Sequence, residues 1–527
     1  MKKIFRHFVL PGLVFALTSG YAPAQPNVRQ ALIVLDQHQY DEALKILQTS
    51  PGANMKPEDR AAQELLIGRC YLEKGLLEKA LWQAAGLYYP RYFNYVAKTQ
   101  PENPDKVALY KGYAHLSAEK WNDAVAAFNQ VRAGDWQKLA EVGKNLCAFR
   151  QGQKTPALQV WQGFVDNKSS RRVLSEVGYA WALSGEPGKA EPGLRLCQAN
   201  TFGSKNEEKY KSDLNLAYAT YANRQIDQAL TRFEALRRYR FDYGDDQPDI
   251  PEKREIRFYE PAIYAHLSRL YFEAAVSHFA QAQQFYTQAG KSGEADRVRF
   301  FIATAYFENS DYTAASKTLQ EIIPKLDGAS PYLIPAKTKL AWCGYYLSGA
   351  ATANATWQKL RGEHGEQALF LSEYGRYLIE TGEARPKSDA EKFTQRAVDL
   401  TLQEVAKAAG ILPEQVSFSH IETHIRERRG RKDQIGRIFT NLGYALQVQG
   451  KSLEAIKACE KIRHIEGWNA VTHNEPALFV QMVYSYYDLN RMDDCNVIYY
   501  ELQKNYPEAF GLYEIINLLT IYKKRYG

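Results

Sequence analysis

The chain lacks the short motifs that mark the common enzyme classes. Its 527 residues contain no GxSxG nucleophile elbow, no Walker phosphate-binding loop, no GxGxxG run after a strand and no CxxC pair. These absences argue against serine hydrolases, P-loop enzymes, dinucleotide-binding enzymes and CxxC-type zinc or redox sites. A pair of catalytic carboxylates stays possible, because such pairs assemble only in space. We therefore expect a protein that is not an enzyme and that carries no cofactor and no metal.

Strong charge of one sign is also absent, and so are long apolar runs beyond the first residues. The formal charge of +7 is too small to indicate a nucleic-acid partner, and no later stretch could span a bilayer. Residues 1–6 are basic, residues 8–17 are apolar, and residues 22–24 form an A-x-A cleavage site. Residues 1–24 therefore predict a signal peptide. With no cysteine near the cleavage site, a bacterial lipid anchor is not expected. The Lys-rich leader is typical of bacteria, and we expect a periplasmic protein, with secretion as the alternative.

What the sequence does contain is a repeated helical pattern. Small and apolar residues recur at helical spacing through residues 442–446, Gly450 interrupts them, and a second apolar face runs from Leu453 to Ile462. This pattern predicts two amphipathic helices packed back to back, and residues 483–507 repeat it. A hairpin this small cannot bury its own apolar face, so further hairpins should stack on either side.

These hairpins resemble the tetratricopeptide repeat (TPR) family, in which a small residue stands in each helix where the two helices touch and Pro closes the unit. The small residue of the second helix recurs along the chain, at Ala43, Ala80, Ala124, Ala157, Ala190, Ala229, Ala275, Ala315, Ala353, Ala455 and Cys495. The resemblance implies an all-α, TPR-type solenoid: a right-handed superhelix of about twelve hairpins with a C-terminal capping helix. The long step before Ala455 predicts a degenerate tenth repeat and an insert.

The repeat frame divides the chain into seven segments. Repeat two is expected as a hairpin over residues 66–87, repeat seven as a hairpin around Ala275, and the tenth repeat as broken at residues 384–386. The segments are a signal peptide (1–24), an N-terminal TPR array (25–240), an acidic Pro-rich loop (241–260), a central TPR array (261–382), a helical insert (383–434), a C-terminal TPR pair (435–510) and a capping helix (511–527).

Three patterns imitate functional motifs. Carboxylates of the acidic loop lack the ligand order and the Gly of an EF-hand. Ala406, Gly410 and Val416 have the spacing of a helix-turn-helix, but an exported protein does not meet DNA. His420 and His424 stand at i and i+4, yet Glu422 lies between them on another face and no third ligand is identifiable. We interpret these patterns as a solvated loop, a helix-loop-helix with a basic tail, and an exposed polar face.

The six cysteines would suggest disulfides in an exported protein. Cys70, Cys459 and Cys495, however, stand at helix-contact positions of the repeat frame, where a small apolar side chain is required. We therefore expect buried thiols. The state of Cys459 and Cys495 stays open, because adjacent repeats could bring this pair together.

Aromatic residues indicate where a partner could bind. The sequence has 36 Tyr, and many follow the small contact residue of a first helix, where the TPR resemblance implies that side chains point into a concave groove. Equivalent positions and those one turn further along give the predicted partner-binding residues Arg69, Tyr113, Tyr179, Tyr218, Tyr221, Tyr264, Thr304, Phe307, Trp342, Tyr345, Arg376, Tyr444, Tyr484 and Tyr487. Two interpretations stay open: these side chains line the groove, or they pack on the adjacent helix.

Two function classes follow. Exported TPR proteins that the chain resembles act as scaffolds, which implies a non-enzymatic adaptor that binds other envelope proteins, or an extended peptide segment, in envelope assembly, secretion or polysaccharide export. The alternative is direct binding of an extended glycan, either exopolysaccharide or peptidoglycan. Tyrosines do not separate the two classes, because they suit a peptide and a sugar chain equally. A third hypothesis makes residues 387–433 a projecting docking arm. The partner, the pathway and the oligomeric state are not indicated by the sequence.

Overall fold

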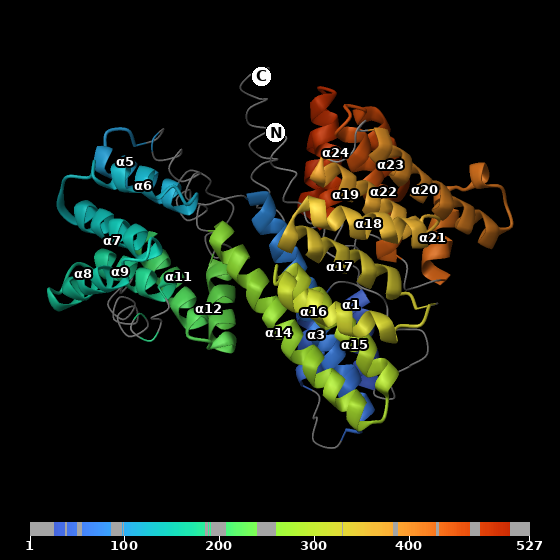
Figure 1. The fold of residues 1–527 in the computed structure, drawn as a ribbon, viewed down its shortest axis with the longest axis horizontal. Helices are drawn as coiled ribbons and strands as arrows, with labels where there is room; N and C mark the ends of the chain where they lie inside the picture. The colour runs from blue at the N-terminus through green and yellow to red at the C-terminus, as the bar shows by residue number, and fades with distance from the viewer. Residues whose placement is uncertain are drawn as a thin grey trace. The chain divides into compact units, whose positions relative to one another are not determined.

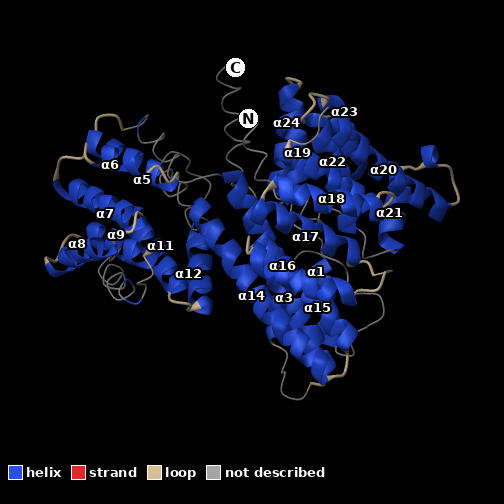
Figure 2. Cartoon of the chain, in the orientation of Figure 1, coloured by secondary structure: helices blue, strands red, loops and turns tan. Residues whose placement is uncertain are grey.

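The computed structural model describes residues 26–36, 39–49, 55–85, 100–184, 207–239, 260–328, 330–382, 388–427, 432–463 and 475–505, with a few single positions between them. Within these ranges the regular elements are all helices (Figure 2). None of these helices is long and apolar enough to cross a membrane. The predicted signal peptide, the acidic loop apart from its last residue, and the capping helix lie outside the described residues.

The chain divides into two compact units. Unit 1 consists of residues 1–84 and 271–527, and unit 2 consists of residues 85–270. The helices of unit 2 are α5 (Pro104–Ser117), α6 (Trp121–Phe128), α7 (Gly134–Arg150), α8 (Lys154–Asp166), α9 (Arg171–Leu183), α11 (Glu207–Ala222), α12 (Ile226–Tyr239) and the first part of α14 (Glu260–Gln288) (Figure 1). Helices α5 and α6, α7 and α8, and α11 and α12 pair as consecutive hairpins.

Unit 1 contains two further groups of helices. Its N-terminal helices are α1 (Pro26–Asp36), α2 (Tyr40–Gln48) and α3 (Pro57–Ala85). After the second part of α14 follow α15 (Ser292–Glu308), α16 (Tyr312–Ile322), η4 (Ile323–Lys325), α17 (Leu333–Ser348), α18 (Ala350–His364), α19 (Ala368–Thr381), α20 (Ser388–Ala409), η5 (Pro413–Gln415), α21 (Phe418–Glu427), α22 (Lys432–Gln447), α23 (Ser452–Arg463), α24 (Glu475–Asp488) and α25 (Met492–Asn505).

The small residues that mark the second helices occupy the helix contacts, as predicted. Full burial is possible there because a methyl or thiol group lets two helix backbones approach closely. In the second helices that the structure describes, each of these small residues is at most 1% exposed: Ala43, Ala124, Ala157, Ala229, Ala315, Ala353, Ala455 and Cys495. The first helices use glycine for the same purpose. A Cβ on Gly112 or on Gly143 would lie within 2.5 Å of the Phe128 ring, so α5 and α7 both approach α6 at glycines.

Two of the predicted hairpins are wrong. The segments around Ala80 and Ala275 are not helix pairs, because α3 and α14 are single helices of 29 residues each. The two helices pack on each other instead. A Cβ on Gly68 would lie 2.6 Å from the Phe279 ring, one on Gly75 would lie 2.7 Å from the Phe272 ring, and both contacts fit an antiparallel pair.

The error has a physical reason. A glycine between two apolar segments is typical of a turn, but Gly75 lies inside α3 and is a contact residue. A helix tolerates an interior glycine where close packing offsets the lost entropy. Polar contacts strengthen the pair: His278 Nδ1 lies 2.6 Å from Glu64 Oε2, and the Arg60 guanidinium lies 4.3 Å from the centre of the Phe285 ring. Residues 86–259, which make up most of unit 2, therefore stand in sequence between the two helices of one pair.

The tenth repeat is also different from the prediction. Helix α20 begins just beyond the predicted break and packs against α19, so it supplies the missing second helix rather than an insert. A Cβ on Gly375 would lie 2.6 Å from Cγ2 of Thr394, and Ala390 and Thr394 are fully buried. Helix α20 also contacts α21 and α22. The docking-arm hypothesis is therefore wrong for residues 388–409, which belong to the packed array.

Candidate functional site

Apart from Tyr264 on α14, the predicted partner-binding residues lie on helices that the repeat frame places first in a pair, and none of them is fully exposed. Those that are buried are Arg69, Tyr113, Tyr264, Thr304, Phe307, Trp342, Arg376 and Tyr484. Those that are half-buried are Tyr179, Tyr218, Tyr221, Tyr345, Tyr444 and Tyr487. Their role in partner binding stays a prediction, but the two units use them in different ways.

In unit 1, charged side chains join neighbouring first helices in a buried network that we call the buried ladder. It begins at Glu308 on α15, whose side chain is completely buried. The Glu308 carboxylate accepts from Lys79 Nζ on α3 at 3.1 Å and from Lys339 Nζ on α17 at 3.0 Å. Lys79 Nζ also donates to the Glu308 carbonyl oxygen at 2.6 Å. One carboxylate thus ties α15 and the nearby α17 to α3, which is distant from both in sequence.

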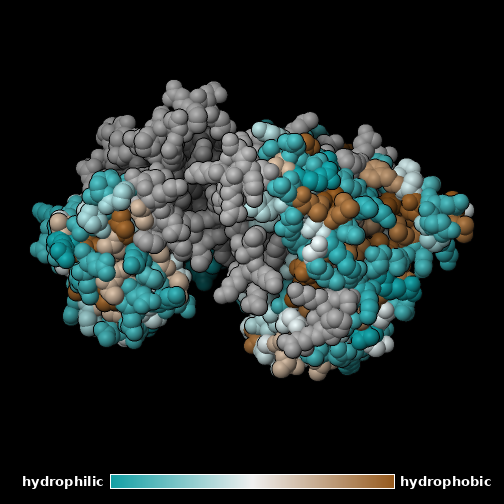
Figure 3. Space-filling model, turned by 90° about the horizontal axis from the view of Figure 1, so that it is seen from above, coloured by the Kyte–Doolittle hydropathy of each residue, from teal (hydrophilic) through white to brown (hydrophobic). Residues whose placement is uncertain are grey.

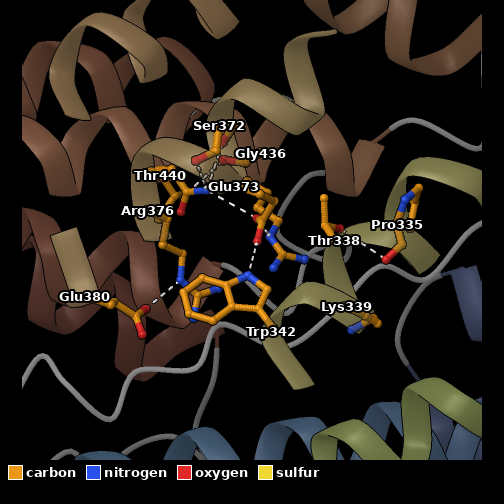
Figure 4. A network of polar contacts seen from close by, with 12 residues as sticks. Pro335, Thr338, Lys339, Trp342, Ser372, Glu373, Arg376, Glu380, Gly436 and Thr440 are labelled. Carbon is orange, nitrogen blue, oxygen red and sulfur yellow. Dashed lines mark hydrogen bonds and ion pairs between the residues drawn. The ribbon is translucent and has the colours of Figure 1, made fainter. Parts of the chain in front are cut away.

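The buried ladder continues through α17, α19 and α22 (Figure 4). Trp342 Nε1 donates to Glu373 Oε2 at 3.1 Å, and the same carboxylate pairs with the Arg437 guanidinium. Arg376 Nε donates to Glu380 Oε1 at 2.7 Å, and its guanidinium lies 5.0 Å from the centre of the Trp342 ring. The predicted groove cation Arg376 is therefore already paired inside the fold.

Two lysines share one carboxylate at the start of the buried ladder. Burial alone would raise the pKa of Glu308, but the charges and hydrogen bonds of Lys339 and Lys79 outweigh it and lower that pKa to about 2. Burial lowers the pKa of Lys339, and Glu308 offsets this only in part. Because buried ions are stable only when they are paired, Glu308 holds both cations in place. We interpret the buried ladder as a structural element of the array.

Unit 2 carries a different arrangement, which we call the tyrosine row: Tyr179 on α9, with Tyr218 and Tyr221 on α11. The Tyr179 and Tyr218 rings meet at 5.3 Å between centres and 65° between planes. The Tyr218 and His266 rings meet at 4.8 Å and 56°. Helices α9 and α11 lie side by side, which fixes these contacts (Figure 1). The rings are therefore covered by one another, while their outer edges remain partly open.

Two exposed arginines that the sequence analysis missed stand beside the tyrosine row. Arg150 is the last residue of α7, and Arg269 lies on α14 one turn after His266. Burial raises the pKa of Tyr179 and of Tyr218, and the positive charges of both arginines oppose that rise. Both guanidinium groups therefore act electrostatically on both tyrosines. The repeat pattern does not predict these arginines, because it singles out only the position after the small contact residue of a first helix and the position one turn further along.

Stacked helical hairpins with small residues at each contact are present in both units. The fold is an all-α, TPR-type solenoid. No protein-family model and no curated protein matches the chain. Among solved structures, it is similar to the APC/C hetero-tetramer Cut9–Hcn1, with a TM-score of 0.32 and 11% identity over 95% of this chain and 97% of that chain.

Two further solved structures are similar over part of the solenoid. A protein from Podospora anserina, described as a kinesin light chain with nearly identical TPR-like repeats, has a TM-score of 0.18 and 17% identity over 37% of this chain and 96% of its own. The apo form of RapI has a TM-score of 0.27 and 12% identity over 66% of this chain and 98% of its own. At these values none of these structures transfers a function or a partner to the solenoid.

The cysteines and histidines of the solenoid are placed mostly as predicted. Cys70, Cys147, Cys343, Cys459 and Cys495 are buried free thiols, which confirms that interpretation for the described cysteines. The expected exposed face at His420 and His424 is wrong for His424, which is 4% exposed because α21 packs it toward α20. Within the described residues, no group of three His, Cys, Asp or Glu side chains could hold a metal ion.

Proposed function

We propose that this chain is a non-enzymatic scaffold that binds partner proteins, and that unit 2 takes up an extended segment of a partner. The observation that carries the proposal is the tyrosine row with Arg150 and Arg269. Half-buried tyrosines offer a large contact area at a small cost in conformational entropy, and exposed arginines offer directed hydrogen bonds. In unit 1, by contrast, the charges of the buried ladder are engaged with one another.

The packing of the rings favours a peptide over a glycan. A sugar ring binds best against the open face of an aromatic side chain. The Tyr179 and Tyr218 rings meet at 65°, and the Tyr218 and His266 rings at 56°, so each ring presents its edge or face to a neighbour. What such packing leaves accessible is the hydroxyl end. Hydroxyl groups and guanidiniums suit the polar groups of an extended peptide.

We further propose that the scaffold works in the bacterial periplasm, within a complex for envelope assembly, secretion or polysaccharide export. The support is the leader: a basic start, an apolar run and the A-x-A site at residues 22–24. Fractionation of the producing cells followed by N-terminal sequencing tests this. We expect a periplasmic chain that begins at Gln25. A chain that retains Met1 in the cytoplasm would refute the export proposal, and recovery from the medium would replace periplasm by secretion.

Capture of partners from crosslinked native envelopes tests the scaffold proposal. The parent chain is compared with the double variant Tyr218→Ser and Tyr221→Ser and with the control variant Tyr500→Ser, whose side chain is 65% exposed in unit 1. A milder variant, Tyr179→Phe with Tyr218→Phe, keeps the ring packing. Circular dichroism and thermal melting confirm that each variant is folded.

A defined envelope protein that the parent and the control capture, and that the folded tyrosine-row variants lose, would support the scaffold. Enrichment of polysaccharide without any specific protein would support the glycan alternative instead. If every variant captures the same partners as the parent, the tyrosine row is not the binding surface.

A further inference from the structure

The turn between α20 and α21 stands apart from the rest of unit 1 and carries exposed apolar residues. We call residues 408–419 the hairpin tip. None of its residues is buried, and Leu412 is 56% exposed. Helix α21 and η5 make their main contacts with α20. In Figure 3, brown apolar residues gather at the right-hand edge, which is the end of unit 1 that α20 and α21 form in Figure 1.

The hairpin tip has only one charged residue. Its sequence is AAGILPEQVSFS, and the single charge is that of Glu414. Charged residues make up 24% of the whole chain, and a turn that only faces water is usually built from polar residues. Single exposed leucines are common on protein surfaces, so the composition alone does not identify a binding surface. The backbone of the hairpin tip provides the second observation.

Most backbone N–H groups of the hairpin tip are bonded within the hairpin. The Leu412 N–H donates to Gln415 Oε1 at 3.0 Å, and the Gln415 N–H donates to the Leu412 carbonyl oxygen at 3.0 Å. The Ser417 N–H donates to His420 Nδ1 at 3.1 Å. Residues 411 and 416 donate to the carbonyl oxygens of residues 406 and 413. An apolar surface could therefore cover the hairpin tip without depriving these donors of their acceptors.

The same contacts give the hairpin tip a fixed shape. Gly410 has φ +69° and ends α20, and Pro413 begins η5. Ser417 Oγ lies 2.8 Å from His420 Nδ1, which fixes the start of α21. A side chain on a fixed turn loses little conformational freedom when it binds. Leu412 is therefore presented to solvent in a geometry that is already organised for contact.

The charge and the size of the hairpin tip favour a protein partner over a lipid surface. Leu412 is the exposed large apolar side chain, while Val416 and Phe418 are already half-buried. One leucine is a weak membrane anchor, since even a whole myristoyl chain gives only marginal binding. Anionic lipids would also repel Glu414. A protein pocket can enclose the leucine and, at its rim, place an Arg or Lys beside that carboxylate.

We propose that the hairpin tip is a docking surface for a folded partner protein. Leu412 enters an apolar pocket of that protein, and Glu414 pairs with an Arg or Lys at the rim of the pocket. This inference goes beyond the proposed function, because it adds a contact surface in unit 1 that does not involve the tyrosine row. Residues 388–409 belong to the packed array, and they position the hairpin tip instead of binding the partner themselves.

Photo-crosslinking of the full chain in the cells that produce it tests the proposal. The photo-reactive residue p-benzoylphenylalanine replaces Ala409, which is exposed in the hairpin tip, so Leu412 and Glu414 stay intact. In the control chain it replaces Ala351, which is exposed on α18. Mass spectrometry identifies the crosslinked protein and its crosslinked residue. We expect one defined protein from position 409 but not from position 351, with the crosslink beside an apolar pocket that has a cation at its rim.

Binding of the purified crosslinked protein to variants of the full chain then measures each contact. Leu412→Ser should weaken binding about tenfold, and Glu414→Gln about threefold. The matched control Leu453→Ser, whose parent side chain is 43% exposed on α23, should stay within about twofold of the parent. Melting temperatures confirm that each variant is folded.

Several outcomes would overturn the proposal. They are equal affinity of Leu412→Ser and Leu453→Ser, the same crosslinks from both positions, and no crosslink at all. Crosslinks to lipid, together with binding to vesicles of phosphatidylethanolamine and phosphatidylglycerol, would identify a membrane contact instead. Crosslinks to a second copy of the chain would identify self-association.

Capture of partners separates this inference from the scaffold proposal. If Leu412→Ser captures every partner of the parent while the tyrosine-row variants lose them, the docking surface is refuted and the proposed function remains. If Leu412→Ser loses its partner while Tyr218→Ser with Tyr221→Ser keeps all partners, the hairpin tip is a binding surface and the tyrosine row is not.

Discussion

The buried ladder of unit 1 and the tyrosine row of unit 2 occupy corresponding first helices, yet they treat polar groups in opposite ways. In the buried ladder, Glu308 meets Lys79 and Lys339 from neighbouring helices, and every one of these side chains is at least 96% buried. In the tyrosine row, aromatic rings cover one another, and Arg150 and Arg269 stay exposed. A position in the repeat therefore fixes which face a residue occupies, while its neighbours decide whether the polar groups on that face are paired within the fold or stay exposed.

The largest effect should come from breaking the buried ladder. Glu308→Ala removes the shared carboxylate and leaves two lysines buried without compensation, which should lower the free energy of unfolding by about 3 to 5 kcal/mol. Urea unfolding followed by circular dichroism measures the loss, and hydrogen exchange of peptides from α15 locates it in unit 1.

The matched control is Glu366→Ala, which removes an exposed ion pair. Glu366 Oε2 lies 2.9 Å from Arg396 Nη2, and the Glu366 side chain is 78% exposed. The loss there should stay below about 1 kcal/mol. If both variants lose equally little, the buried ladder does not hold unit 1 together.

Acid should weaken the two units in different pH ranges. The folded-state pKa of His266 lies at about 3, below its ordinary value of 6.5. As the pH falls, the unfolded chain therefore binds a proton at this residue at a higher pH than the folded chain does. Unit 2 should therefore lose up to about 1.4 kcal/mol per pH unit as the pH falls below 6.5 toward 3. The folded-state pKa of Glu308 is depressed to about 2 from 4.5, so its contribution is complete above pH 4.5 and is lost below it.

Hydrogen exchange at a series of pH values tests this difference. Between pH 6.5 and 4.5, peptides from α11 should lose protection while those from α15 keep it. The variant His266→Phe keeps an aromatic ring beside Phe233, which lies 5.0 Å away between ring centres, and it should remove the slope in unit 2. An unchanged slope in that variant would assign the acid sensitivity to other groups.

The sequence predicted the helices and their contact residues well, because both depend on local spacing. Small residues such as Ala229 and Ala315 could be identified from helical periodicity alone, and the structure buries both completely. The pairing of α3 with α14 could not be predicted in the same way. It depends on Gly68 and Gly75 meeting Phe279 and Phe272 across about 200 residues of chain, and periodicity contains no information on such contacts.

The candidate site was predicted in part for the same reason. Tyr179 and Tyr218 follow the repeat frame and were found by it. Arg150 and Arg269 stand outside the positions that the repeat frame singles out, and only the packing of the helices makes their charges act on the same two tyrosines. Arg376 was expected to serve a ligand, but Glu380 one turn later in the same helix binds it.

The long-range helix pair of unit 1 gives a prediction of intermediate size. Gly68→Ala places a Cβ 2.6 Å from the Phe279 ring and should lower the free energy of unfolding by about 1 to 3 kcal/mol. Gly163→Ala, inside α8 with no atom within 4 Å of the new Cβ, should instead stabilise the protein by up to about 1 kcal/mol. Thermal melting compares the two.

Adding Phe279→Leu to Gly68→Ala should recover part of the loss, because the smaller side chain makes room for the new methyl group. If Gly68→Ala stabilises the protein as Gly163→Ala does, α3 and α14 do not pack at this glycine.

The smallest effect should separate two tyrosines of unit 2. Tyr113→Phe removes the hydroxyl that donates to the buried Glu176, so it should cost about 1 to 2 kcal/mol of stability. Tyr218→Phe removes a hydroxyl that donates to no described residue, so its cost should stay within about 0.5 kcal/mol. Capture of partner proteins should show the reverse order, with the larger loss in Tyr218→Phe. Equal stability losses would mean that both hydroxyls serve the fold, and the distinction between inward and outward polar groups in unit 2 would then disappear.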